Sequence, residues 1–207
     1  MNTKMKQWVP VLFACLITTA AFSGLAAASE FSADFVMKGG PMSGKGKIWV
    51  KGNKMCQEFG GQMGKMITII DLDQGVQWVV MPEGKMYMEN KIETTGKGFR
   101  PENFAGMQQG QMKAKVKLVG SEKVNGYACD KYVVTFENKE MGTMTQWFAK
   151  KLEYPIKTIN ESPQMGKIVT ELENIKKESV KDDLFKVPAG YKEMKQPMMP
   201  QIPTEEE

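Results

Sequence analysis

Histidine is absent from this chain of 207 residues, and cysteine is scarce, with three in all. Without histidine the chain cannot build a Ser-His-Asp triad, a Cys-His dyad or a His-ligated zinc site. An excess of one charge is also lacking, because 28 basic and 24 acidic residues leave a net charge of only +4. That bias is too weak to indicate a nucleic-acid partner. We therefore predict a protein that is not an enzyme, needs no cofactor and binds no nucleic acid.

Long apolar runs are also rare, and the main one lies at the N-terminus. Lysines precede it, and small residues end it at Ala26 and Ala28, which is typical of a signal peptide cleaved after Ala28. The alternative is a lipoprotein signal with acylation at Cys15, but too few apolar residues precede that cysteine. No later segment has the roughly 18 apolar residues of a membrane-spanning helix. We expect residues 1–28 to be removed and the mature chain to be periplasmic.

Cleavage would leave two cysteines, Cys56 and Cys129. An oxidising compartment favours a disulfide between them. Such a bond requires Cα atoms within about 7 Å of each other, and spacing along the sequence does not determine that distance. The alternative is two buried free thiols that act as small apolar side chains.

Alternation of apolar and polar residues runs through most of the remaining chain. In the clearest case Tyr132, Val134 and Phe136 alternate with Lys131, Thr135 and Glu137, as on a strand with one buried face. Turn residues separate about ten such runs, a spacing typical of an antiparallel meander. A sheet of this size with almost no helix must curl into a barrel or half-barrel, or split into a sandwich.

Three segments depart from this alternation. Residues 96–112 are rich in glycine and carry Phe104 and Met107 about one helical turn apart, so we predict a short helical lid over one sheet face. Residues 181–185 predict a single helical turn. Residues 195–207 combine proline, methionine and glutamate, and their proline density predicts a disordered tail.

Short motifs in the mature chain resemble those of a known family. They include Gly-x-x-Cys-x-Lys-Tyr, Tyr-Pro-Ile-Lys and Val-Pro-x-Gly-Tyr, and they lie at residues 46–52, 126–132, 147, 154–157, 166, 172–175, 184–185 and 187–191. With these motifs the chain resembles the periplasmic lipoprotein carriers (LolA/LolB-like) and, more closely, a related group of exported bacterial domains of unassigned function. The resemblance implies that residues 29–194 form one mainly β domain. It would be a single antiparallel curved sheet of about eleven strands, a half-open β-barrel with a short helical lid. In the carriers, the apolar concave face receives lipoprotein acyl chains.

The apolar face of such a sheet is the candidate ligand site. Alternation and the lid prediction assign ten residues to it: Phe35, Met37, Trp78, Met86, Met88, Phe104, Met107, Val134, Phe136 and Phe148. We expect this surface to hold an apolar ligand, either a lipid or the acyl chain of a lipoprotein. The face assignment depends on register, since a shift of one residue turns a strand's side chains to the other face.

Methionine is the residue in excess, with 18 in the chain, 16 of them after Ala28. Thioethers are soft ligands that suit Cu(I) or Ag(I), and several methionines lie close together in sequence: Met63, Met66, Met86, Met88, Met141 and Met144. Methionine also fills irregular apolar space and adapts to varied partners. Soft-metal binding is therefore the alternative function. A sensor that contacts another envelope protein is a third.

Overall fold

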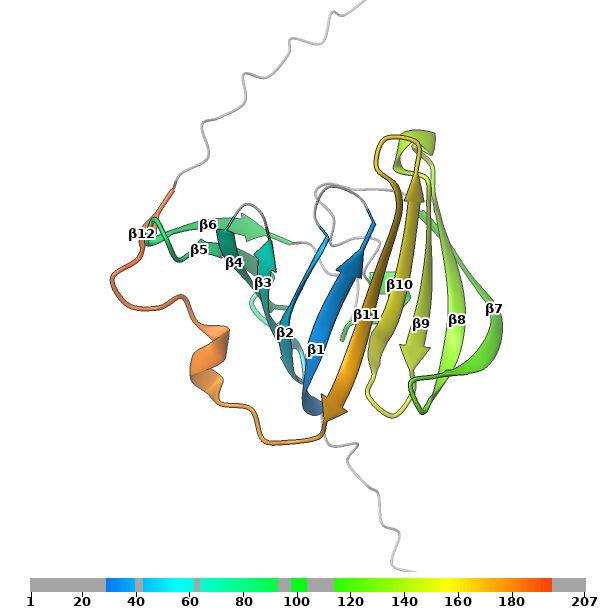
Figure 1. Cartoon of the computed structure of the whole chain (residues 1–207), viewed down its shortest axis with the longest axis horizontal. Helices are drawn as coiled ribbons and strands as arrows, with labels where there is room; N and C mark the ends of the chain where they lie inside the picture. The colour runs from blue at the N-terminus through cyan, green and yellow to red at the C-terminus, as the bar shows by residue number, and fades with distance from the viewer. Residues whose placement is uncertain (1–28, 40–42, 62–63, 93–97, 104–113, 195–207) are drawn as a thin grey trace, which may run out of the picture.

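The computed structural model describes residues 29–39, 43–61, 64–92, 98–103 and 114–194. Within these residues, twelve strands form one sheet that is not closed into a barrel (Figure 1), which confirms the predicted mainly β fold class. The strands are β1 (Glu30–Lys38), β2 (Gly44–Lys51), β3 (Lys54–Gly61), β4 (Gly64–Asp71), β5 (Val76–Met81), β6 (Met86–Lys91), β7 (Ala114–Val124), β8 (Tyr127–Phe136), β9 (Thr143–Ala149), β10 (Tyr154–Ser162), β11 (Gly166–Lys176) and β12 (Lys192–Glu193). Two short 3-10 helices accompany them, η1 (Lys139–Met141) and η2 (Asp182–Phe185).

The strands lie in the order β12-β6-β5-β4-β3-β2-β1-β11-β10-β9-β8-β7. The pairs are antiparallel, except that β12 runs parallel to β6. Tight turns join many neighbours. At the β7–β8 hairpin, for example, Asn125 and Gly126 both have positive φ, as a two-residue hairpin turn requires. The first strand, β1, pairs with β2 on one side and with β11 on the other, so it joins the two halves of the sheet (Figure 1).

The sheet curls around one of its faces, which we call the concave face. Residues paired directly across strands share a face, and Phe35 on β1 defines this one through its partners Leu172 and Gly46. Ile70 of β4 and Ile156 of β10 belong to the same buried cluster as Phe35, although four strands separate β4 from β10 in the sheet. The main hydrophobic core therefore lies inside the curve.

The C-terminal part of the chain covers the opposite, outer face over strands β3 to β5. Val180 and Phe185 are buried there against Cys56, Ile69 and Val80. η2 begins one residue later than the predicted helical turn and ends at the same residue. We call residues 177–194 the C-terminal strap; Figure 1 shows it outside the N-terminal half of the sheet.

The described part of the predicted lid, residues 98–103, lies against the concave face. It belongs to the connection between β6, next to one end of the strand order, and β7, at the other end. Phe99 is 1% exposed, with its ring centroid 5.2 Å from that of Tyr154, and the Arg100 guanidinium lies 5.6 Å from the centre of the Phe148 ring. A helical turn begins at Pro101.

Several predictions fall outside the described residues: the signal peptide at 1–28, lid residues Phe104 and Met107, and the tail at 195–207. In the part of the chain that the structure describes, no helix is long and apolar enough to cross a membrane.

Candidate ligand-binding site on the concave face

Most of the predicted ligand-binding residues share the concave face. We call strands β2 to β6 the N-terminal wing and strands β7 to β11 the C-terminal wing; β1 lies between them. Cross-strand pairs connect the predicted residues from Met88 opposite Val79 on the N-terminal wing to Met144 opposite Val134 on the C-terminal wing. Seven of the ten predicted residues are on this face: Phe35, Met37, Met86, Met88, Val134, Phe136 and Phe148.

Trp78 was predicted to line the concave face, and that prediction is wrong, because it lies on the outer face. It is the cross-strand partner of Ile69 on β4 and Glu89 on β6, and its indole Nε1 donates to Glu89 Oε2 at 2.9 Å. Its ring packs against the cluster that the C-terminal strap closes. Trp78 therefore stabilises the attachment of the strap, and it does not line the concave face.

The concave face is rich in methionine, beyond the residues that the sequence analysis selected for it. Met55 and Met66 face the same side as Phe59 and Gly46. Between β5 and β6, Met81 is the direct cross-strand partner of Met86. Met55 and Met81 could have been found from the sequence only with the correct register of β3 and β5. Of the other methionines proposed as metal ligands, Met141 ends η1 and packs beside Met144, and Met63 lies outside the described residues.

Two cavities open on this face, and they meet. The first, of about 280 Å³, is lined by apolar residues of β1 to β3 and by Met144, with Thr158 and Thr170 on its far side. The second, of about 200 Å³, lies between Phe136 and Ile168. Met144 and Asn160 line both cavities, so the two adjoin and together form one elongated, mostly apolar groove over β1 to β3 and β9 to β11. Glu140, Ser162 and Gln164 are the further polar residues in the lining of the second cavity.

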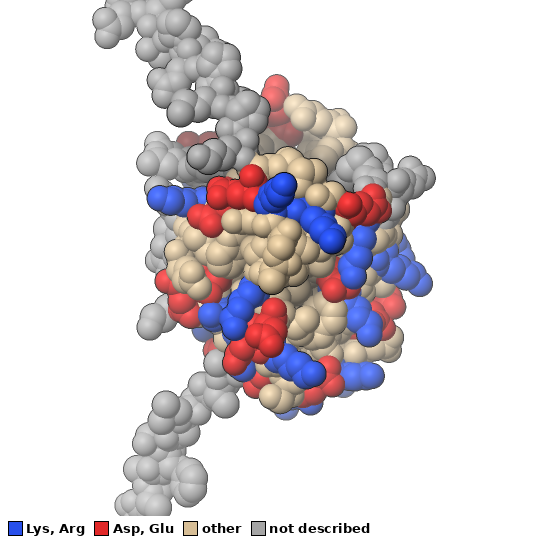
Figure 2. Space-filling view, turned by 90° about the vertical axis from the view of Figure 1, so that its left-hand side faces the viewer, with Lys and Arg blue, Asp and Glu red and all other residues tan. Residues whose placement is uncertain are grey.

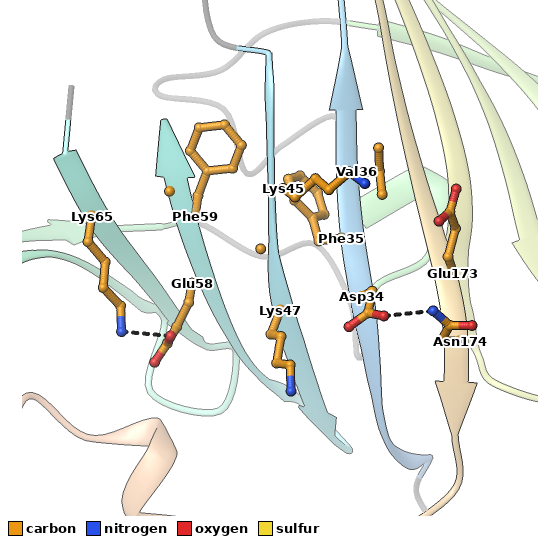
Figure 3. Close-up of a pocket in the computed structure, with 12 residues that line it drawn as sticks. Asp34, Phe35, Val36, Lys45, Lys47, Glu58, Phe59, Lys65, Glu173 and Asn174 are labelled. Atoms are coloured by element: carbon orange, nitrogen blue, oxygen red, sulfur yellow. Dashed lines mark hydrogen bonds and ion pairs between the residues drawn. The ribbon is translucent and has the colours of Figure 1, made fainter. Parts of the chain in front are cut away.

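A larger hollow, of about 530 Å³, lies over β11, β1, β2, β3 and β4 and is bordered by charged residues (Figure 3). Lys65 Nζ lies 2.8 Å from Glu58 Oε2, and Asn174 Nδ2 donates to Asp34 Oδ2 at 2.7 Å. Figure 2 likewise shows charges of both signs interspersed on the side of the molecule that carries β6 and the strap. Mixed, mutually paired charges of this kind are typical of a solvated face, so we regard the smaller concave groove as the better site for an apolar ligand.

The predicted disulfide is not present, since Cys56 and Cys129 are both free and buried. Cys56 is on β3 and Cys129 on β8, and five strands lie between β3 and β8 in the sheet. Cys56 is buried in the outer-face cluster beneath the strap, whereas Cys129 belongs to the main core cluster, so the two thiols lie in separate clusters. Burial raises the pKa of the Cys56 thiol to about 12, which makes it unreactive near neutral pH.

The site chemistry offers apolar contact and a few neutral hydrogen-bonding groups. Gln57, Asn160 and two threonines are the uncharged polar residues of the first cavity, and Lys157 is its charged residue. Among the described residues, no group of three or more His, Cys, Asp and Glu side chains is placed to ligate a metal ion.

A family model described as a domain of unknown function (DUF4412) matches residues 36–154 and 150–191, more than half of the chain. No curated protein matches the sequence. An uncharacterized conserved protein from Thermus thermophilus has a similar structure, with 10% identity and a TM-score of 0.55 over 83% of this chain and 93% of that one. At this identity the similarity shows a shared fold and nothing more.

Weaker structural similarities have TM-scores below 0.5. The Pseudomonas aeruginosa MucA/MucB complex gives 13% identity and a TM-score of 0.48, over 79% of this chain and 57% of that one. A LolA superfamily protein from Nitrosomonas europaea gives 11% and 0.37, over 76% and 90%. The family model confirms the part of the sequence resemblance that concerns a domain family of unassigned function.

Proposed function

We propose that this chain, which belongs to the family described as a domain of unknown function (DUF4412), is a non-enzymatic binding protein. Its concave face would hold an apolar ligand, a lipid or the acyl chain of a lipoprotein. The observation that carries the proposal is the elongated apolar groove whose two cavities meet at Met144 and Asn160.

The shape and lining of the groove suit a flexible hydrocarbon chain. Ligand pockets are mostly apolar and commonly begin at roughly 300 Å³, which is close to the volume of the first cavity alone. Methionine side chains are unbranched and polarisable, so they adapt to chains of different length and shape. The methionines of β5 and β6, Met81, Met86 and Met88, extend the apolar surface beyond the groove.

The compartment is part of the same proposal. We propose that residues 1–28 are a cleaved signal peptide and that the domain at 29–194 acts in the periplasm, followed by the tail at 195–207. Its partners would be the apolar ligand or lipoprotein itself, or another envelope protein that delivers or receives the ligand.

A substitution that fills the groove tests the proposal. Thr170 is half-buried and lines the first cavity, so Thr170→Phe should lower the affinity for a dansyl-labelled fatty acid at least about tenfold. Thr145→Phe is the matched control. Thr145 of β9 is also half-buried, but it pairs with Val133 and Ile159 on the outer face. Its affinity should stay that of the wild type.

Native mass spectrometry of protein purified from its own cell envelope adds an independent measurement. We expect a co-purified apolar ligand. Finding none, together with no binding of the labelled fatty acid to the wild-type protein, would contradict the proposal.

A second candidate function is supported by the pair Met81 and Met86. Direct cross-strand partners have Cβ atoms about 5 Å apart, close enough for two thioethers to share one Cu(I) or Ag(I) ion. Met86→Leu should then weaken Cu(I) binding about tenfold in competition with a chelator, while Met165→Leu, at a position 56% exposed, should have no effect. Wild-type affinity no higher than that of free methionine would end this idea.

A further inference from the structure

Gln146 is a fully buried amide on the concave face, and its hydrogen bonds are incomplete. The side chain has no exposed surface. Its Nε2 donates to the sulfur of Met144 at 3.5 Å, and in the part of the chain that the structure describes nothing donates to its Oε1. Buried polar atoms without a partner are rare in native proteins, so this carbonyl oxygen calls for an explanation.

The position of Gln146 supplies one. It lies on β9, two residues after Met144, and its direct partner on β10 is Thr158. Both of these neighbours line the first cavity. Two residues further along β9 is Phe148, where Arg100 of the lid segment sits over the ring. Gln146 is therefore flanked by residues that line the first cavity, and its fully buried side chain lies directly behind that lining.

We infer that Gln146 recognises a neutral hydrogen-bond donor on the ligand. The ligand class is then an apolar chain that carries an amide N–H or a hydroxyl near its polar end. This inference rests on the proposed function, since the apolar part of the same ligand fills the groove. A fully apolar ligand would leave the Gln146 oxygen unpaired and gain nothing from it.

A matched pair of probes tests the inference on the wild-type protein. N-dodecylacetamide carries an amide N–H, and dodecyl acetate has an ester oxygen in its place with the same length of chain. Sites built to hydrogen-bond a ligand group discriminate strongly against analogues that lack it. We expect the amide to displace a dansyl-labelled fatty acid at about a tenfold lower concentration than the ester. Equal displacement by the two probes would overturn the inference and leave apolar binding intact, whereas binding of neither probe would remove both.

Variants identify the residue responsible. Gln146→Met keeps the length of the side chain and removes its polar atoms, so the two probes should then bind equally well. Gln77→Met is the control, because Gln77 is a half-buried glutamine of β5 that lines neither cavity; it should keep the wild-type preference for the amide. Thermal unfolding separates recognition from a structural role: Gln146→Met should be at least as stable as the wild type, and a clearly lower midpoint would show that the amide serves the fold and would overturn the inference.

Discussion

Asp71 shows how one carboxylate can organise a turn from inside the protein. It has no exposed surface. Its Oδ2 lies 2.8 Å from Lys54 Nζ, and its Oδ1 accepts from the backbone N–H groups of Asp73 and Gln74. Burial on its own would raise the pKa of Asp71, but the hydrogen bonds from Lys54 and Gln74 outweigh it and hold the pKa below the ordinary value of 3.8.

Replacing Asp71 should destabilise the protein in a pH-dependent way. Asp71→Asn removes the carboxylate that pairs with Lys54, and because the Lys54 side chain is 36% exposed, water can solvate its charge, so we expect a loss of about 1–2 kcal/mol at neutral pH. A lowered pKa in the folded state stabilises above the unfolded pKa, and this contribution disappears as pH falls through the folded value. The difference between wild type and variant in urea unfolding should be constant from about pH 7 to 5 and shrink below about pH 4.

The exposed pair of Asp183 and Lys186, with nitrogen and oxygen 3.2 Å apart, provides the control. Asp183→Asn should leave the free energy of unfolding unchanged, because solvent screens such pairs. A difference between wild type and Asp71→Asn that persists unchanged down to pH 3 would show that the charge of Asp71 is not the cause.

At the scale of single residues, the sequence predicted which side chains alternate, and not always which face they occupy. In β8, Val134 and Phe136 lie on the concave face, although Val133 makes the other face partly apolar as well. In β5 the residues Trp78 and Val80 on the outer face are matched by Val79 and Met81 on the concave face, so both faces are apolar. Alternation cannot choose between two apolar faces, and the strap that makes the outer one apolar is distant in sequence.

Among the elements, β2 is shaped by a glycine. Gly46 is opposite both Phe35 and Phe59, and the rings of these two residues meet edge to face across it with centroids 6.1 Å apart. A Cβ built on Gly46 would lie 1.8 Å from the backbone oxygen of Glu58. Only glycine allows this close approach of β2 and β3 where the sheet curls.

Gly46→Ala should therefore cost about 2–3 kcal/mol or more, because backbone atoms have to move. Gly60, on the neighbouring strand β3, is the matched control. Its added Cβ would meet nothing closer than 4.0 Å, so Gly60→Ala should change the free energy of urea unfolding by less than about 1 kcal/mol. Similar losses for the two variants would contradict this account of the curvature.

The elements themselves could largely be predicted from the sequence, because strands and turns depend on local patterns. The turn at Asn125 and Gly126 is an example, since few other residues adopt the conformation that it needs. What these patterns could not provide is the path of the chain between elements. That the C-terminal strap covers the outer face, with Phe185 buried on it, depends on contacts between residues more than a hundred positions apart.

For the whole molecule, the central place of β1 has a consequence for stability. Ser32 pairs with Trp49 of β2 and with Lys176 of β11, so the strand connects sheet neighbours that are far apart in sequence. Phe31 packs edge to face with Tyr154 of β10, at 5.7 Å between centroids, and joins both halves in one core cluster. Neither half keeps a complete core when β1 is removed.

The two halves should consequently unfold together. After the signal sequence, the tryptophans are Trp49 and Trp78 on the N-terminal wing and Trp147 on the C-terminal one. A variant that keeps only Trp147, with phenylalanine at the other two positions, reports on β9. The Trp147→Phe variant reports on β2 and β5.

In each variant, the urea midpoint from tryptophan fluorescence should equal the midpoint from far-ultraviolet circular dichroism, which follows the whole sheet. Coincident transitions are the signature of a single cooperative unit. If the wings were independent, fluorescence from one wing would change at a different urea concentration from the dichroism. That result would mean that the pairing of β1 with β2 and β11 does not couple the two cores. The elongated groove, whose first cavity is lined from β1 to β3 as well as from β9 to β11, would then open whenever one wing unfolded.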